Sequence, residues 1–238
     1  MNVQSVSAAD VSKPDDDAGN GILINKMNKL TIENISHADD EFLKLFNQEI
    51  TGLDEKLIRL INDKGVKIIL ADKLSDVNKG DNSDIEKYQD YHPADRDKVC
   101  RGLCSDNLNA LCIFYNTVSL KELGAVLYHE IGHLIDIYPE WGKDEPVPAL
   151  STKQEFINAY NKDITLHWEQ IKNDNRFRLK HYVQNSAPDN ASRAGLCETF
   201  AFCFAGMHNR FEDNNILKSY FPNAQETAED IIDDFFNN

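Results

Sequence analysis

The motif H-E-x-x-H, from His129 to His133, constrains this chain more than any other feature because it falls in a run with helical periodicity. Apolar residues recur at helical spacing along Leu120–Ile137, and the run is too long and too charged for a buried strand. Ser119 and Glu122 have the spacing of a capping box at its start. The pattern therefore predicts a helix that carries the whole motif.

The motif predicts a metal site. Residues four apart share one face of a helix, so His129 and His133 can offer two imidazoles to one metal ion. Glu130 lies beside them and can act on protons, as in zinc peptidases. These residues favour a zinc-dependent hydrolase, most often a peptidase. The alternative is an amphipathic surface helix that carries two histidines by coincidence.

A third ligand is needed, because a catalytic zinc site has three protein ligands and one position open to water. Glu198 is the best candidate, since it is a lone carboxylate in an otherwise apolar helix, where a charge must be paired or bound to metal. Its alternative is a carboxylate that faces solvent. Asp136 is the rival, although it is better suited to support His133 or to anchor the helix end to a loop. His167 and His181 are expected to be surface or core histidines.

The composition limits the partners. A chain of 238 residues, of which 41% are hydrophobic, is long enough for one domain, alone or with a tail. Its net charge of −15 argues against nucleic acid as a binding partner. The negative charge could attract basic substrates weakly, or it could serve solubility alone. No stretch approaches the roughly 18 apolar residues of a membrane span. The N-terminus lacks the basic and apolar regions of a Sec signal peptide, which predicts a protein that is cytoplasmic when synthesised.

The five cysteines favour a reducing compartment, because an odd count without a dense framework is unlike a disulfide scaffold. Cys100, Cys104 and Cys112 have a spacing that weakly suggests a second metal site. Buried or partly exposed thiols are the preferred interpretation.

The pattern along the chain predicts one structured domain after a tail. Residues 1–35 are polar and are expected to form a disordered N-terminal tail, so the domain is expected over residues 36–238. The expected helices lie around residues 42–50 and 57–61, along the motif, and from about residues 152, 190 and 223 onward. The expected strands are residues 66–70 and 110–115, and residues 73–108 are expected to be irregular. This pattern is that of an α+β fold, mostly helical, with a small sheet.

Two stretches of the chain resemble a known family. H-E-I-G-H-L-I-D, residues 129–136, and E-T-F-A-F-C-F-A, residues 198–205, are similar to the catalytic domain of anthrax lethal factor and to the clostridial Pro-Pro endopeptidases. Weaker likenesses at residues 63–70, 153–157 and 220–222 extend the resemblance over about residues 55–236.

The resemblance implies a zincin-like metalloprotease fold with an active-site helix. His129, His133 and Glu198 would then bind Zn²⁺, and Glu130 would be the catalytic base. The family consists of secreted or translocated bacterial toxins and effectors that cut proteins. The expected partner is therefore a protein or peptide substrate, including a host protein, and the chain is expected to be a monomer that is secreted or translocated into a host cell after synthesis.

The chain departs from the family near the third ligand. The family carries a tyrosine about two helical turns before that ligand, where it assists the oxyanion, but Ala191 holds this position here. Tyr182 is the nearest replacement and is the predicted second catalytic residue. The long spacing between His133 and Glu198 predicts an extra loop over residues 172–191.

Two other functions remain open at this point. One is a zincin-fold binding module that has lost turnover or holds a structural zinc, and the other is a metal-dependent amidase that acts on a non-peptide substrate. For a peptidase, we expect the substrate to add as an extended strand at an exposed sheet edge beside Ala110–Tyr115.

Overall fold

The computed structural model describes residues 21–25, 30–36, 38–77, 97–141, 148–174, 191–210 and 214–237. It has more helix than strand and one small mixed sheet, which agrees with the α+β class expected from the sequence. The chain divides into two compact units, one that ends at Leu123 and one that begins at Gly124. The boundary falls there because strand pairing holds the first unit together and helix packing holds the second.

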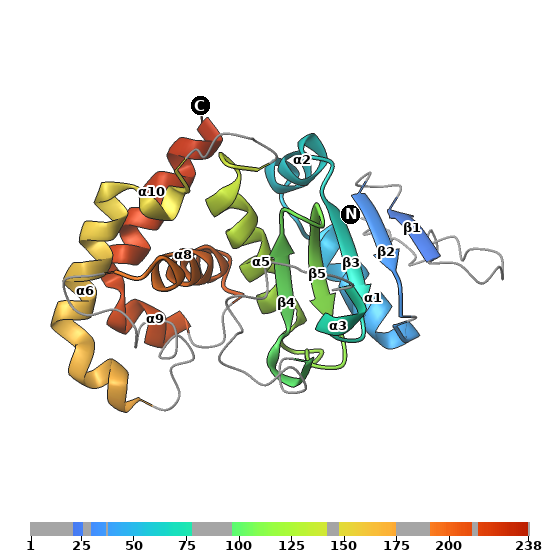
Figure 1. Cartoon of the computed structure of the whole chain (residues 1–238), viewed down its shortest axis with the longest axis horizontal. Coiled ribbons are helices and arrows are strands. Elements are labelled where there is room, and N and C mark those ends of the chain that lie inside the picture. The colour runs from blue at the N-terminus through green and yellow to red at the C-terminus, as the bar shows by residue number, and fades with distance from the viewer. Residues whose placement is uncertain are drawn as a thin grey trace, which may run out of the picture. The chain divides into compact units, whose positions relative to one another are not determined.

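The first unit is built on a five-stranded sheet in the order β1-β2-β3-β5-β4 (Figure 1). Its three central strands, β2, β3 and β5, run parallel, and the two outer strands pair antiparallel to their neighbours. The bounds are β1 Gly21–Asn25, β2 Leu30–Asn34, β3 Lys67–Ala71, β4 Gly102–Ser105 and β5 Ala110–Phe114.

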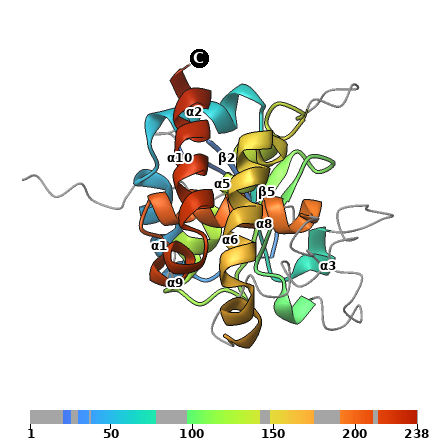
Figure 2. The ribbon, with the colours of Figure 1, turned by 90° about the vertical axis from the view of Figure 1, so that its left-hand side faces the viewer.

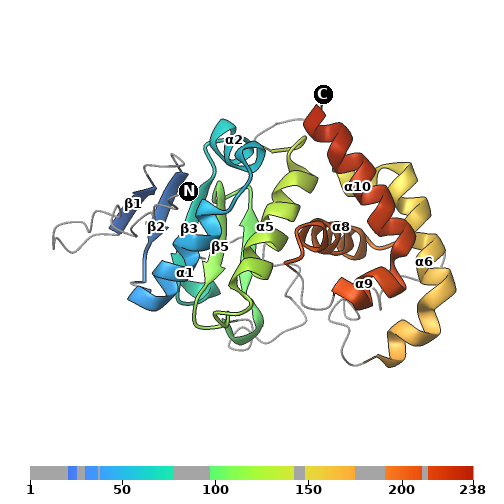
Figure 3. The same ribbon diagram turned by 180° about the vertical axis from the view of Figure 1, so that it is seen from behind.

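Helices cover both faces of this sheet. Helix α1, Asp40–Thr51, lies across the face seen in Figure 3, and the short helix α3, Leu74–Val77, lies on the opposite face. Helix α2, Glu55–Asp63, follows α1 and leads into β3. Every residue of β5 is buried, because a central parallel strand has packed side chains on both faces.

The strand that was expected to bind substrate is not an edge. Strand β5 pairs with β3 on one side and with β4 on the other, so its backbone groups are already bonded. The expectation of an exposed edge beside Ala110–Tyr115 is therefore wrong. The sequence did not predict β4, because its four residues include a single large apolar side chain, Leu103, and its strand structure depends on pairing with β5.

The expected disordered tail is also shorter than residues 1–35. Strand β2 pairs in parallel with β3, and Leu30 and Ile32 are fully buried in the core. Apolar and polar side chains alternate along β2, but the first twenty residues are so polar that they mask this local signal. Within the expected tail, residues 1–20 and 26–29 lie outside the described residues.

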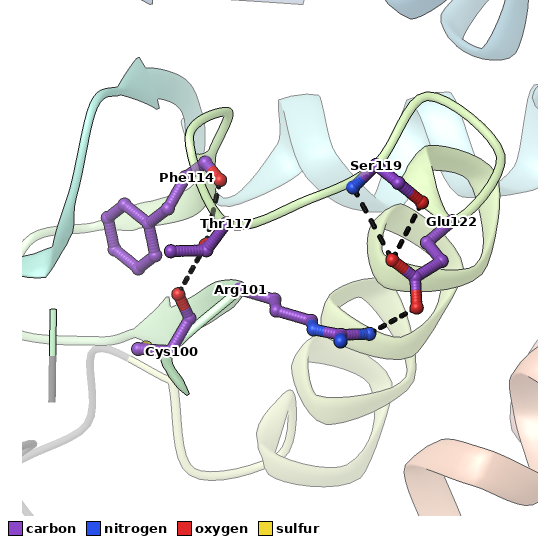
Figure 4. Close-up of polar contacts among 6 residues, drawn as sticks. All are labelled: Cys100, Arg101, Phe114, Thr117, Ser119 and Glu122. Atoms are coloured by element: carbon purple, nitrogen blue, oxygen red, sulfur yellow. Dashed lines mark hydrogen bonds and ion pairs between the residues drawn. The ribbon is translucent and has the colours of Figure 1, made fainter. Parts of the chain in front are cut away.

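Polar contacts fix the segment between β5 and the motif helix α5, Leu123–Ile137 (Figure 4). The Glu122 carboxylate accepts hydrogen bonds from Ser119 Oγ at 2.7 Å and from the Ser119 backbone N–H at 3.4 Å. The other oxygen of Glu122 pairs with the Arg101 guanidinium. The predicted capping box forms in part: the Ser119 backbone N–H donates to Glu122, but the Glu122 backbone N–H donates to the Ser119 carbonyl rather than to Ser119 Oγ, and the regular helix begins after these residues.

The second unit is helical. After α5 come a 3₁₀ turn η2, Leu150–Thr152, and the helices α6, Gln154–Asn173, α8, Arg193–Met207, α9, Asn214–Tyr220, and α10, Pro222–Asn237. Helix α10 packs along α6, as Figure 2 shows, and also against α8. Among the described residues, no helix combines the length and the apolar character needed to cross a membrane.

Side-chain capping of the helix N-termini in this unit agrees with the sequence at α8 but not at α6. Ser192 is the N-cap of α8 and accepts a hydrogen bond from the Gly195 backbone N–H, as expected for a serine before a helix. Thr152 and Glu155 have the spacing of a capping box at the start of α6, but that box does not form. The Thr152 hydroxyl instead donates to the Ala149 carbonyl, because the 3₁₀ turn places it there.

A buried carboxylate holds the start of α10. Asp163 of α6 is fully buried and accepts hydrogen bonds from the Ala224 backbone N–H at 2.8 Å and from Asn223 Nδ2 at 2.5 Å. Burial raises the pKa of Asp163 above its usual value, and the bonds from Asn223 and Ala224 offset part of that rise. Asp163 therefore binds its proton more readily in the folded chain than in the unfolded chain.

This shift predicts a pH dependence of stability. A carboxyl whose folded pKa is raised contributes stability below the unfolded pKa of about 3.9, and that contribution is lost as the pH rises through the folded value. We expect the free energy of unfolding of the native protein, relative to Asp163→Asn, to fall as the pH rises from about 4, since asparagine does not titrate. Denaturant titrations of both proteins across this pH range measure the difference. Parallel curves would contradict the assignment.

Candidate metal centre

The motif helix is an interior helix. No residue between Leu123 and Ile137 is exposed, and Glu130, His133 and Asp136 are all buried. An amphipathic surface helix would present a polar face to solvent, so this alternative for the motif does not fit. Polar groups that are buried in this way need partners, because leaving them unpaired is costly.

Helices α5 and α8 cross at Gly132. A Cβ atom added to Gly132 would lie 2.8 Å from Ala201 Cα and 2.9 Å from the Ala201 carbonyl oxygen. These distances are too short for a real side chain, so only glycine permits the approach. A glycine inside a helical run is the sequence feature that indicates such a close approach. The crossing places Glu198, one turn before Ala201, beside the two histidines of the motif.

The close approach of α5 and α8 predicts how one added methyl group at Gly132 changes the stability of the protein. We expect Gly132→Ala to lower the free energy of unfolding by about 1–3 kcal/mol, the usual cost of overpacking a core. The matched control is Gly52→Ala at the end of α1, where the added Cβ would meet its nearest atoms at an ordinary 3.5 Å. Urea unfolding of both variants compares them. Equal stability of the two variants would show that α5 and α8 do not approach as described.

Three side chains from the two helices converge. His129 Nε2 lies 3.1 Å from His133 Nε2 and 3.3 Å from Glu198 Oε2, and His133 Nε2 lies 3.5 Å from Glu198 Oε1. The three groups offer ligand atoms that all lie within 4.8 Å of one another. They are the residues predicted from the sequence as the metal ligands. Among the described residues, no other group of histidine, cysteine or carboxylate side chains has this arrangement.

The spacing fits a tetrahedral zinc site. Ligand atoms about 2.1 Å from a tetrahedral zinc ion lie roughly 3.4 Å from one another. The three short separations in the trio, 3.1, 3.3 and 3.5 Å, are close to that length. Two imidazoles and one carboxylate are also a known ligand set of catalytic zinc, which leaves one position for water. The residues present therefore fit a zinc ion in number, chemistry and separation.

The electrostatics of the trio favour a charged carboxylate. Burial alone would raise the pKa of Glu198, but His133 and His129 outweigh that effect and hold the pKa well below its usual value. Glu198 is thus an anion in the interior, stabilised by two imidazoles. A buried anion of this kind is ready to bind a divalent cation without first losing a proton.

Glu130 has a different environment. It is 4% exposed, and its Oε2 atom has no hydrogen-bond partner among the described residues. A buried carboxylate oxygen without a partner is uncommon and calls for a functional explanation. A carboxylate that accepts a proton from a water molecule is such an explanation. Glu130 directly follows His129 on the motif helix.

Asp136 does not join the trio. It is fully buried and accepts hydrogen bonds from the Ser151 backbone N–H at 2.6 Å and from Ser151 Oγ at 2.9 Å. Ser151 Oγ also lies 3.5 Å from Cys197 Sγ, next to Glu198. Asp136 therefore anchors α5 to η2, one of the two supporting roles expected from the sequence, and not the rival role of third ligand.

The remaining candidates lie elsewhere. His167 is on α6 with its ring 6.1 Å from the Tyr220 ring, and it is not part of a metal-binding group among the described residues. Cys100, Cys104 and Cys112 lie in the first unit, and no metal-binding group found among the described residues includes them. His181 and the predicted catalytic Tyr182 lie outside the described residues. Ala191 directly precedes the N-cap of α8.

Two residues that contact the site were not predicted from the sequence. No sequence pattern indicated Ser151, because its role depends on a hydrogen bond to Asp136, which lies fifteen positions earlier in the chain. Phe202, whose ring lies against His129, could have been found, since it follows Glu198 by four positions and shares its helix face.

A comparison of the sequence with models of protein families and with curated proteins gave no match.

Proposed function

We propose that this chain is a zinc-dependent endopeptidase with a zincin-like fold, in which His129, His133 and Glu198 bind Zn²⁺. The observation that supports the proposal most strongly is the convergence of these three side chains next to Glu130, whose buried Oε2 has no hydrogen-bond partner among the described residues. Zinc held by such a ligand set lowers the pKa of a coordinated water to about 7 and polarises the carbonyl of the substrate.

In this proposal Glu130 transfers protons. Its carboxylate accepts a proton from the attacking water as the water oxygen bonds to the peptide carbonyl carbon, and it then delivers that proton to the amine nitrogen as the C–N bond breaks. The α5–α8 crossing and the Asp136–Ser151 anchor keep the helix that carries Glu130 in place. Tyr182 stays the predicted donor to the oxyanion.

The resemblance to the lethal factor family extends the proposal to the biological role. It supports action on a protein substrate as a bacterial toxin or translocated effector. The net charge of −15 agrees with a substrate segment that is neutral or basic rather than acidic.

The test is a cleavage assay in which the products are identified. Purified protein with a measured zinc content is incubated with a complex protein mixture, and new amino termini are identified by mass spectrometry. We expect new termini that disappear with a zinc chelator and return when zinc is added back. Release of small amines without new termini would favour an amidase.

A zinc-binding module without turnover is the second candidate, favoured by Ala191 at the position where the related proteases carry a tyrosine. It predicts bound zinc with no chelator-sensitive cleavage in the same assay. A structural zinc would also have four protein ligands, whereas the described residues offer three.

A further inference from the structure

Phe202 lies against the first histidine of the motif. The ring centroids of Phe202 and His129 are 4.3 Å apart, and the ring planes are inclined by 49°. Phe202 follows Glu198 by four positions on α8, so the two side chains project from the same face of the helix. His129 thus meets a carboxylate from one turn of α8 and an aromatic ring from the next.

The second ring nitrogen of His129 lacks an acceptor. His129 Nδ1 is buried and has no hydrogen-bond partner in the part of the chain that the structure describes. A histidine that binds a metal almost always donates its other ring N–H to a carboxylate, a carbonyl or a water, which fixes the tautomer and the orientation of the ring. At His129 some other contact has to orient the ring.

We propose that Phe202 is a positioning residue that orients His129 for the metal by ring packing, in place of this hydrogen bond. The inference rests on the proposed zinc site but not on peptidase activity. Ring packing holds the plane of the imidazole without making it a stronger ligand, whereas an acceptor at Nδ1 would do both. The structure therefore predicts that a hydrogen-bond acceptor at position 202 can replace the aromatic ring.

The test compares zinc affinity in two variants that differ in one property. Both Phe202→Leu and Phe202→Gln remove the ring, but only glutamine brings a carbonyl oxygen that can accept a hydrogen bond from His129 Nδ1. We expect Phe202→Leu to raise the Kd for zinc about tenfold and Phe202→Gln to bind at least about tenfold more tightly than Phe202→Leu. Competition with a chromogenic chelator measures each Kd.

A control on the same helix separates positioning from general packing. Phe200 is fully buried, and its ring contacts Phe156 with centroids 5.3 Å apart. Phe200→Leu should lower the thermal midpoint and leave the Kd for zinc unchanged.

Two results would overturn the inference: a native Kd in Phe202→Leu, or a Kd in Phe202→Gln no lower than in Phe202→Leu. Failure of the proposed function would give another result. The native protein would then bind zinc without cleaving protein, and the Phe202 variants would still differ in their Kd for zinc. A native chain that binds no zinc would overturn both.

Discussion

Glu130→Gln is expected to abolish most hydrolysis while the protein keeps its zinc. Glutamine has nearly the same volume as glutamate, so the buried position on α5 stays filled. It cannot accept a proton from water, and the loss of a general base lowers the rate by about 10²–10⁴-fold. The measurement pairs turnover of a cleaved peptide with zinc content per chain.

The control for Glu130 is an exposed carboxylate in the same unit that does not belong to the metal-binding group. Glu155, in the first turn of α6, meets this description. Glu155→Gln should keep both native turnover and native zinc content. Full activity in Glu130→Gln would remove this residue from the role of base, and loss of zinc in the same variant would show that its carboxylate serves the metal instead.

Elements with strong local signals could be predicted from the sequence. The helices α1, α2, α5, α8 and α10 and the strands β3 and β5 each carry a continuous apolar pattern, and each lies where that pattern placed it to within a few residues. Strand β2 alternates too, but a polar segment precedes it, and its parallel partner β3 is more than thirty residues further on. Strand β4 has almost no pattern of its own, because pairing with β5 determines it. The pairing of β2 with β3 joins residues far apart in the chain, and one sequence does not show it.

The residues of the candidate site also differ in whether the sequence alone could predict them. His129, Glu130 and His133 form a local pattern, and Glu198 was found because a single charge in an apolar helix has to be compensated. The contacts that support them were not predictable. Ser151 reaches Asp136 from a 3₁₀ turn, and no local spacing indicates such a contact. Gly132 suggested a close approach, but only the fold shows that the approaching residue is Ala201.

Glu198→Gln is expected to raise the Kd for zinc by more than about 100-fold. Loss of a residue that only supports a ligand costs about 10–100-fold in metal affinity, and loss of a charged ligand should exceed that range. Glutamine preserves the packing of α8 but removes the anion that faces His129 and His133. A competition titration with a chromogenic chelator gives the Kd, and circular dichroism verifies that the variant is folded.

Asp136→Asn distinguishes a ligand from an anchor. Asp136 is as deeply buried as Glu198, but its two oxygens are held by Ser151 rather than by the histidines. The variant keeps all three metal-binding side chains, so its affinity for zinc should fall by no more than about 100-fold, while its thermal midpoint falls because an amide cannot accept both hydrogen bonds. If Asp136→Asn lost zinc and Glu198→Gln retained it, the third ligand would be Asp136, and the convergence of α5 and α8 on one metal ion would be refuted.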